Sequence, residues 1–167
     1  MERIMAQKYH RLNIVLHWLI FILVVFTYYS GWNKALPLHR FLGALVLVFA
    51  LIRLFTMHLW RRKFAPLPQK PWEKLVASLT KIALALLFII VPLLGIVFRM
   101  YYGLDLVFFG YVVVPHDWVG YDPTLGNSLR LWHLRIAYFA LFLLAIHAAI
   151  ACYHQFVKKD KLLERML

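Results

Sequence analysis

The stretch WHLRIAYFALFLLAIHAAIACYH, residues 132–154, predicts a membrane-spanning helix because it is long, apolar and almost uncharged. The uncharged run that begins in it, Ile136 to Val157, is long enough to cross the hydrocarbon core of a bilayer as a helix. Three further stretches share this character: Leu12 to Tyr29, Leu38 to Trp60 and Ile82 to Phe98. Lipid offers no hydrogen bonds to an exposed backbone, so all four stretches are expected to be helical.

The composition of the whole chain agrees with a membrane protein. Of the 167 residues, 63% are hydrophobic and only 16% are charged, and the mean hydropathy is +0.72. A soluble domain needs more polar surface than this. The expected fold is therefore an all-α integral membrane four-helix bundle. It forms one domain over residues 1–167, with spans at about 12–30, 38–60, 79–100 and 129–157.

The basic charge indicates how the bundle is oriented. Lys and Arg number 19 against 7 Asp and Glu, which gives a formal net charge of +12. Such an excess suggests nucleic acid in a soluble protein, but in this apolar chain we expect no nucleic-acid partner. Segments 1–16, 61–81 and 158–167 together hold 13 basic and 4 acidic residues, and the segments on the opposite side hold 5 and 3. By the positive-inside rule, the N- and C-termini are both expected in the cytoplasm.

The cysteine content excludes several kinds of redox site. Cys152 is the single cysteine, so one chain cannot form an internal disulfide, an iron–sulfur cluster or a thiolate zinc cage. The C-x-x-C-H motif that attaches a c-type haem is absent as well.

Four histidines fall at two depths in the expected bundle. His133 and His147 are 14 residues apart on the fourth span, so they share one helix face about 21 Å apart along the axis. His39 opens the second span and forms an outer pair with His133. His17 lies near the cytoplasmic end of the first span and forms an inner pair with His147. Depth alone leaves His154 open as the partner of His17.

Paired histidines on facing helices are typical axial ligands of a haem iron. Zinc is disfavoured because each level offers two imidazoles with neither thiolate nor carboxylate nearby. Small residues such as Ala137 and Ala140 leave space beside the helix, although they also suit plain helix packing. A haem-free proton or solute carrier is a further interpretation. The remaining histidines are expected in terminal or loop positions: His10, His58 and His116.

Several arginines and one glycine are expected beside the haems. The arginines are expected there because buried haem propionates require cationic partners. Arg53 follows His39 by 14 residues, which places it on a similar face at the inner level. Arg40 adjoins the outer histidines, as do Arg130 and Arg135. Gly43, one turn from His39, leaves room for a ring. The alternatives are snorkelling of each arginine to lipid headgroups and helix packing at Gly43.

The chain resembles the bacterial cytochrome b561 family, of the superoxide oxidase type of di-haem membrane cytochromes b. The matching stretches are KYHRLNIVLHWLIF, LHRFLGALVLVFALIRL, IIVPLLGIV, residues 132–154 and the tail KDKLLERM. The resemblance implies that His17 and His147 ligate a cytoplasmic-side haem b. It implies that His39 and His133 ligate a periplasmic-side haem b.

The resemblance also implies a function in the bacterial inner membrane. Periplasmic superoxide would be oxidised and ubiquinone reduced, and no catalytic residue is assigned. The alternative is an anchor subunit that docks a partner oxidoreductase or cytochrome and exchanges electrons with the quinone pool. Lysines on the cytoplasmic side are candidates for a quinone headgroup: Lys70, Lys74 and Lys81. One departure lies at the start of the third span, where such proteins often carry extra histidines and this chain has Ser78, Thr80 and Lys81.

Overall fold

The computed structural model describes residues 8–60, 70–159 and 163–166. Its four long helices are α1 (Arg11–Trp32), α2 (Leu36–Leu59), α3 (Pro71–Tyr101) and α4 (Pro123–Tyr153). A π-helical segment, η2 (His154–Lys158), continues α4, and η3 (Leu163–Met166) is a short 3-10 helix. All four long helices are long and apolar enough to cross a membrane, which confirms the expected all-α membrane bundle.

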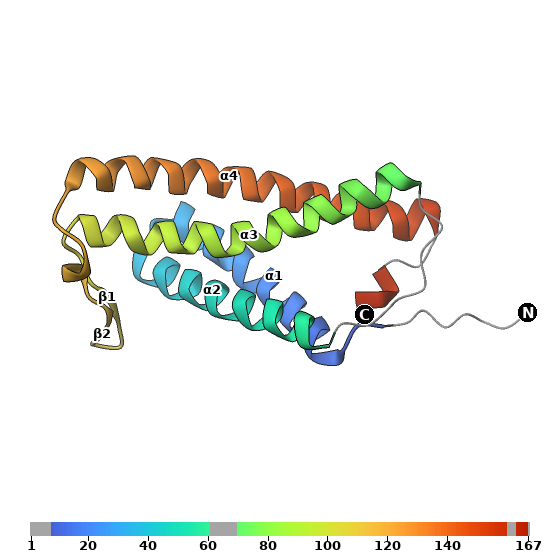
Figure 1. Cartoon of the computed structure of the whole chain (residues 1–167), viewed down its shortest axis with the longest axis horizontal. Coiled ribbons are helices and arrows are strands. Elements are labelled where there is room, and N and C mark those ends of the chain that lie inside the picture. Colours follow the sequence, from blue (N-terminus) through green and yellow to red (C-terminus); the bar gives the residue numbers. More distant parts are fainter. Residues whose placement is uncertain (1–7, 61–69, 160–162, 167) are drawn as a thin grey trace, which may run out of the picture.

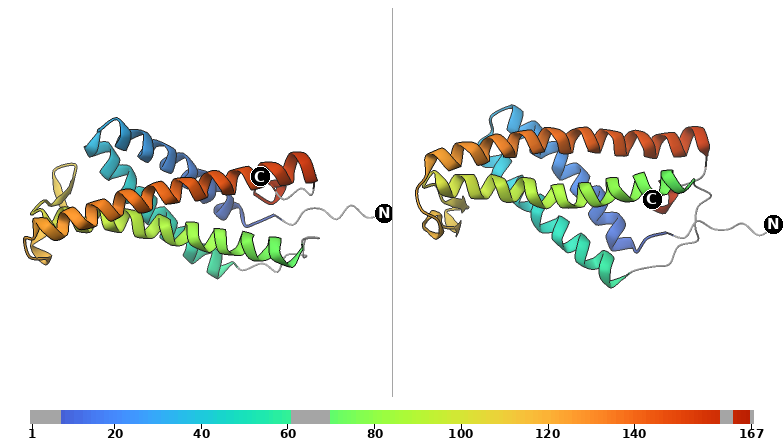
Figure 2. Two further views of the ribbon diagram at one scale, coloured as in Figure 1. Left: turned by 90° about the horizontal axis from the view of Figure 1, so that it is seen from above. Right: turned by 45° about the horizontal axis from the view of Figure 1, so that its top comes forward.

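The four helices pack as two hairpins (Figure 1). α1 packs along α2 and α3 along α4, and α2 contacts α3. α1 begins and α4 ends at the same end of the bundle, here called the terminal end. The opposite end carries the short β-strands and is called the hairpin end. Figure 1 and the right-hand view of Figure 2 show α1 and α2 diverging from α3 and α4 toward the terminal end.

The last two long helices begin earlier than the apolar runs suggest. α3 begins at Pro71 rather than near residue 79, and α4 begins at Pro123 rather than near residue 129. Proline suits the first helical position because the missing N–H would have no helical partner there. The Asp122 side chain accepts hydrogen bonds from the N–H groups of Thr124 and Leu125 and caps α4. These local signals extend both helices beyond the hydrophobic segment.

The aromatic connection at the hairpin end is partly structured. β1 (Leu106–Phe108) pairs with β2 (Tyr111–Val114) in an antiparallel hairpin, followed by the 3-10 helix η1 (His116–Trp118). Phe109 and Gly110 form the turn with φ angles of 52° and 83°, as a tight hairpin requires. Large side chains here are exposed, as expected of a segment at the membrane surface: Phe109, Tyr111, Trp118 and Tyr121.

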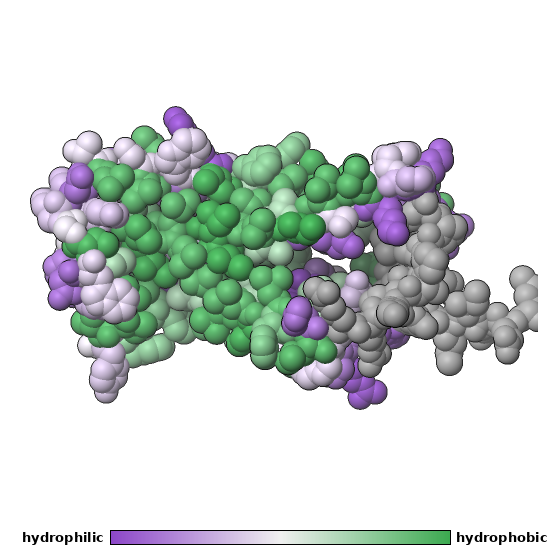
Figure 3. All heavy atoms as spheres, viewed as in Figure 1, coloured by the Kyte–Doolittle hydropathy of each residue, from purple (hydrophilic) through white to green (hydrophobic). Residues whose placement is uncertain are grey.

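Little of the apolar content is buried inside the protein. The buried cluster consists of Ile20, Leu23, Val24 and Val46, with Phe88 and Leu144 packed against it. Most other large apolar side chains face outward and form a continuous apolar belt along the helices (Figure 3). Polar residues gather toward the two ends. This distribution is that of a bundle whose sides face lipid.

Candidate functional site

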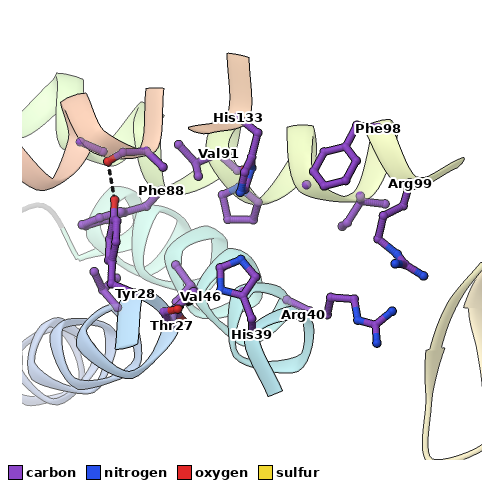
Figure 4. A pocket seen from close by; sticks show the side chains of 18 of the residues that line it. Thr27, Tyr28, His39, Arg40, Val46, Phe88, Val91, Phe98, Arg99 and His133 are labelled. Atoms are coloured by element: carbon purple, nitrogen blue, oxygen red, sulfur yellow. Dashed lines mark hydrogen bonds between the residues drawn. The ribbon is translucent and has the colours of Figure 1, made fainter. Parts of the chain in front are cut away.

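The outer pair lies between α2 and α4 near the hairpin end. The ring centroids of His39 and His133 are 6.2 Å apart and the rings are almost perpendicular, at 88° (Figure 4). An imidazole nitrogen binds a transition metal at about 2 Å, and its ring centroid lies roughly 1 Å further away. Two imidazoles on opposite sides of one metal therefore have centroids about 6 Å apart. The observed separation suits a single metal ion between the rings.

Backbone carbonyl groups hold both outer imidazoles. Nδ1 of His39 lies 2.8 Å from the Thr27 carbonyl oxygen, and Nδ1 of His133 lies 2.9 Å from the Val91 carbonyl oxygen. A neutral imidazole that donates through Nδ1 keeps the lone pair of Nε2 free. This is the usual arrangement of a metal-binding histidine. The hydrogen bonds therefore prepare both side chains to act as ligands through Nε2.

A cavity of about 280 Å³ adjoins the outer pair (Figure 4). Its walls are mostly apolar. On the α4 side they include Ala137 and Ala140, whose small side chains leave space open. Gly43 also lines it, and a Cβ atom at Gly43 would meet no other atom within 4 Å. Packing within the described protein therefore does not explain the glycine, whereas a flat group between the histidines would occupy the space beside it.

Three arginines line the same cavity: Arg40, Arg99 and Arg130. Figure 4 shows Arg40 and Arg99 at the same end of it. Arg99 donates through Nη2 to the Asp105 carbonyl oxygen at 2.9 Å. Its buried Nε has no hydrogen-bond partner among the described residues. Because an unpaired buried cation is costly, this donor suits a carboxylate entering the cavity.

Two outcomes at this level differ from the expectation. Arg135 lies over the Trp132 ring, 5.7 Å from its centroid, and is not among the residues that line the cavity. Arg99 takes part instead, although sequence reasoning did not assign it to the site. The available signal was its spacing from Gly95, since residues four apart lie on one helix face.

The inner pair has the same ring geometry as the outer pair. His17 on α1 faces His147 on α4 with ring centroids 6.5 Å apart and an interplanar angle of 81°. His154 lies in the π-helical segment, buried against the Tyr153 ring. Of the two histidines that depth left open, the structure thus brings His147 to His17. This separation also suits one metal ion between two imidazoles.

Arg53 is the cation of the inner level. It lies on α2, close enough for its charge to act on both His17 and His147. Its buried Nε has no hydrogen-bond partner within the described part of the chain. Nearby, the Thr56 hydroxyl donates to the Asn13 side-chain oxygen at 2.6 Å and fastens α2 to α1. Arg53 therefore presents the same kind of unpaired donor as Arg99.

The three lysines considered for a quinone headgroup lie at the beginning of α3. Lys81 is close enough to act electrostatically on His147, and Lys74 is exposed on α3. The backbone N–H of Lys70 donates to Glu73 Oε2 at 3.3 Å, and Glu73 forms an ion pair with Lys158 at 2.8 Å. Only Lys81 of the three lysines is thus connected to a histidine pair by the described contacts.

The other histidines lie away from the two pairs. The ring of His10 stacks on Trp60, and His58 lies in the last turn of α2 rather than in a loop. His116 contacts Asp105 through Nδ1 at 2.6 Å and also donates its backbone N–H to the same carboxylate oxygen. The side-chain hydrogen bond to His116 holds the pKa of Asp105 below its ordinary value. This contact was not expected, and it fastens the β-hairpin near Arg99.

Four membrane helices that carry two levels of facing histidines define the architecture of a haem-binding membrane cytochrome. Residues 8–167 match the family model of prokaryotic cytochrome b561, and the chain belongs to this family. Its members are multi-pass membrane oxidoreductases that transfer electrons across the membrane, and the family implies haem b as the cofactor.

Individual relatives align over almost their full length. A probable superoxide oxidase CybB of Yersinia pestis is 30% identical, covering 98% of this chain and 97% of the relative. Cytochrome b561 homolog 1 of Escherichia coli K12 is 29% identical, covering 96% and 97%. A protein named cytochrome b562 of Cereibacter sphaeroides is 30% identical, covering 95% and 94%.

Proposed function

We propose that the chain holds two haem b groups, one between His39 and His133 and one between His17 and His147, and passes single electrons between them. The observation that carries this proposal is the repeated ring geometry, with centroid separations of 6.2 Å and 6.5 Å. A bound haem iron supplies reversible one-electron exchange between its ferric and ferrous states.

The residues of the chain limit what chemistry is available at each level. Two imidazoles at each level would hold the group and leave no ligand position for substrate, so the chemistry that it would supply is one-electron transfer. At the outer level, Arg99 and Arg40 would hold the propionate groups, and Gly43 would leave space for the ring. Arg53 is the corresponding cation at the inner level. The apolar cluster of Ile20 and its neighbours lies along the helices between the two levels.

We further propose that the physiological reaction is superoxide:ubiquinone oxidoreduction. Two superoxide ions each lose one electron and become O₂ at the outer level, and one ubiquinone takes up these two electrons together with two protons to become ubiquinol. The relative named a probable superoxide oxidase supports the donor. Three cavity-lining arginines also favour the approach of a small anion. The lysine and arginine distribution supports cytoplasmic termini in a bacterial inner membrane, with the hairpin end in the periplasm.

The quinone is proposed to receive electrons from the inner level. Among the three lysines considered for the headgroup, the position of Lys81 near His147 favours it. An ammonium group can donate a hydrogen bond to a quinone carbonyl oxygen.

A second function, electron transfer within a larger complex, is supported by the hairpin end. Phe109, Tyr111 and Trp118 are 86%, 77% and 71% exposed there. Exposed aromatic residues of this kind can rest in the headgroup region or contact another protein. In the second case, a partner oxidoreductase or cytochrome would replace superoxide as the electron donor.

Rapid mixing of the oxidised, haem-loaded protein with superoxide in the presence of ubiquinone distinguishes these functions. We expect fast haem reduction followed by ubiquinol formation, and superoxide dismutase added beforehand should abolish both. The His133→Ala variant should lose the fast phase. Absence of haem reduction by superoxide would exclude the oxidase function, and copurification of a stable redox partner would then favour the complex.

A further inference from the structure

The outer imidazoles share a local arrangement that occurs on two different helices. Thr27 provides the carbonyl oxygen for His39, and the residue four positions later on α1 is Gly31. Val91 provides the carbonyl oxygen for His133, and the residue four positions later on α3 is Gly95. Each outer histidine therefore contacts a backbone carbonyl whose residue is followed, four positions later, by a glycine.

Helix geometry explains why glycine is needed at this spacing. The carbonyl of residue i accepts the helical hydrogen bond from the N–H of residue i+4, and each Cβ is tilted back toward the helix N-terminus. A side chain at i+4 therefore stands beside the oxygen of residue i. A second donor from a neighbouring helix can reach that oxygen closely only where this side chain is absent.

The distances agree with this account. A Cβ atom at Gly31 would lie 3.0 Å from Nδ1 and 3.1 Å from Cε1 of His39. At Gly95 it would lie 3.2 Å from Cε1 and 3.4 Å from Nδ1 of His133. Such contacts are closer than an ordinary Cβ accepts, so alanine at either position would push the imidazole away from its carbonyl.

We propose that Gly31 and Gly95 are positioning residues that admit the outer imidazoles to the backbone and thereby lower the reduction potential of the haem between them. The proposal rests on the proposed haem function. An imidazole that donates from Nδ1 is more basic at Nε2. A more basic axial ligand stabilises the ferric state in the one-electron couple Fe(III) + e⁻ ⇌ Fe(II). A weaker Nδ1 hydrogen bond should therefore raise the potential.

Replacing Ser30 is expected to shift the reduction potential of the outer haem in the opposite direction. Its hydroxyl donates to the same Thr27 oxygen at 3.0 Å, and the side chain is almost fully buried, at 1% exposure. Two donors that share one acceptor compete for its electron density. Removing the hydroxyl in Ser30→Ala should strengthen the bond from His39 and lower the potential.

A redox titration of the haem-loaded protein tests the proposal. The His133→Ala variant, which should keep only the inner haem, assigns the two transitions. We expect Gly31→Ala and Gly95→Ala each to raise the midpoint of the outer haem and Ser30→Ala to lower it, while the inner midpoint stays unchanged. Gly120→Ala is the matched control, because a Cβ there meets no atom within 4 Å, and it should shift neither midpoint.

Unchanged outer midpoints in both glycine variants, at normal haem content, would overturn the proposal. So would a shift of both midpoints together, since that indicates a general loosening of the bundle. If alanine at the glycines expels the outer haem, the sign of the Ser30→Ala shift decides the matter. Failure of the proposed function is distinguishable, because the unaltered protein would then show fewer than two haem transitions.

Discussion

The outer and inner histidine pairs reach nearly the same ring separation in different ways. Both outer imidazoles are tied to backbone carbonyls, of Thr27 and Val91. Within the described part of the chain, His17 and His147 make no such hydrogen bond, and the half-buried Arg53, whose Nε is buried, lies beside both. The outer site is thus fixed by side-chain hydrogen bonds, whereas the helix backbones alone place the inner pair.

The packing of the helices also differs between the two levels, being closer around the outer pair. Near the hairpin end, His133 packs against α3 through Gly95, and His39 packs against α1 through Gly31. Toward the terminal end, α1 and α2 diverge from α3 and α4 (Figure 2). Histidine ligands in one bundle thus have two environments, one tied to backbone carbonyls and one beside an arginine. Two haems with distinct properties require such a difference.

The largest expected effect comes from removing single ligands. We expect His39→Ala or His133→Ala to remove the outer haem and His17→Ala or His147→Ala to remove the inner one, so that about one of two haems remains. The absorption spectrum and the haem-to-protein ratio measure this. His154→Ala is the control and should keep both haems. Loss of the same haem from an outer and an inner variant would break the proposed pairing.

The second effect concerns the space beside the outer pair. A Cβ atom at Gly43 would meet no other described atom within 4 Å, and Gly43 lines the cavity. Gly43→Leu should therefore fold normally, with its side chain in the cavity, yet lower the occupancy of the outer haem only. Thermal unfolding of the haem-free protein and its haem content report the two properties separately. Gly120→Leu, equally free of close neighbours in the connection at the hairpin end, should change neither. Normal outer occupancy in Gly43→Leu would show that the ring lies elsewhere.

The third effect is a contrast between two arginines. Arg99→Gln should weaken retention of the outer haem and Arg53→Gln that of the inner haem, each by roughly 10–100-fold, because a buried cationic partner is lost. Haem transfer to apomyoglobin measures retention at each level. Arg135→Gln should have no effect, since Arg135 lies over Trp132. Equal weakening of both haems by either variant would contradict the assignment.

The smallest effect concerns the contact between Asp105 and His116. Because the folded-state pKa of Asp105 is lowered, its stabilising contribution is present above the unfolded value of about 3.9 and is lost as pH falls through the lower folded value. Protection of the hairpin amides from hydrogen exchange, corrected for intrinsic rates, should therefore be no lower at about pH 4.5 than at pH 7. Asp105→Asn should reduce it at both pH values. A marked loss of protection at the lower pH in the unaltered protein would contradict this.

Much of the fold could be predicted from the sequence because lipid imposes a simple pattern. Long uncharged runs must become helices, so the spans were found, and the spacing of His133 and His147 placed them on one face of α4. Helix starts were less predictable, since Pro123 and Asp122 act through local capping outside the apolar run. The hairpin at residues 106–114 was missed because its aromatic residues also suit an irregular interfacial loop.

The candidate site was less predictable than the fold. Depth along the helices indicated two levels but could not choose His147 over His154, since regular helical spacing puts both on one face of the fourth span. That choice depends on how α1 and α4 face each other. The cavity position of Arg99 and the roles of Gly31 and Gly95 depend on contacts between helices, which helical periodicity does not reveal.

The decisive measurement for the proposed two-haem arrangement is the haem-to-protein ratio of the purified chain, together with the spectrum of its reduced form. The two histidine pairs predict two haem b groups per chain, both low-spin because each would be held by two imidazoles. A single haem per chain, or a high-spin haem with an open ligand position, would contradict the proposed two-haem arrangement.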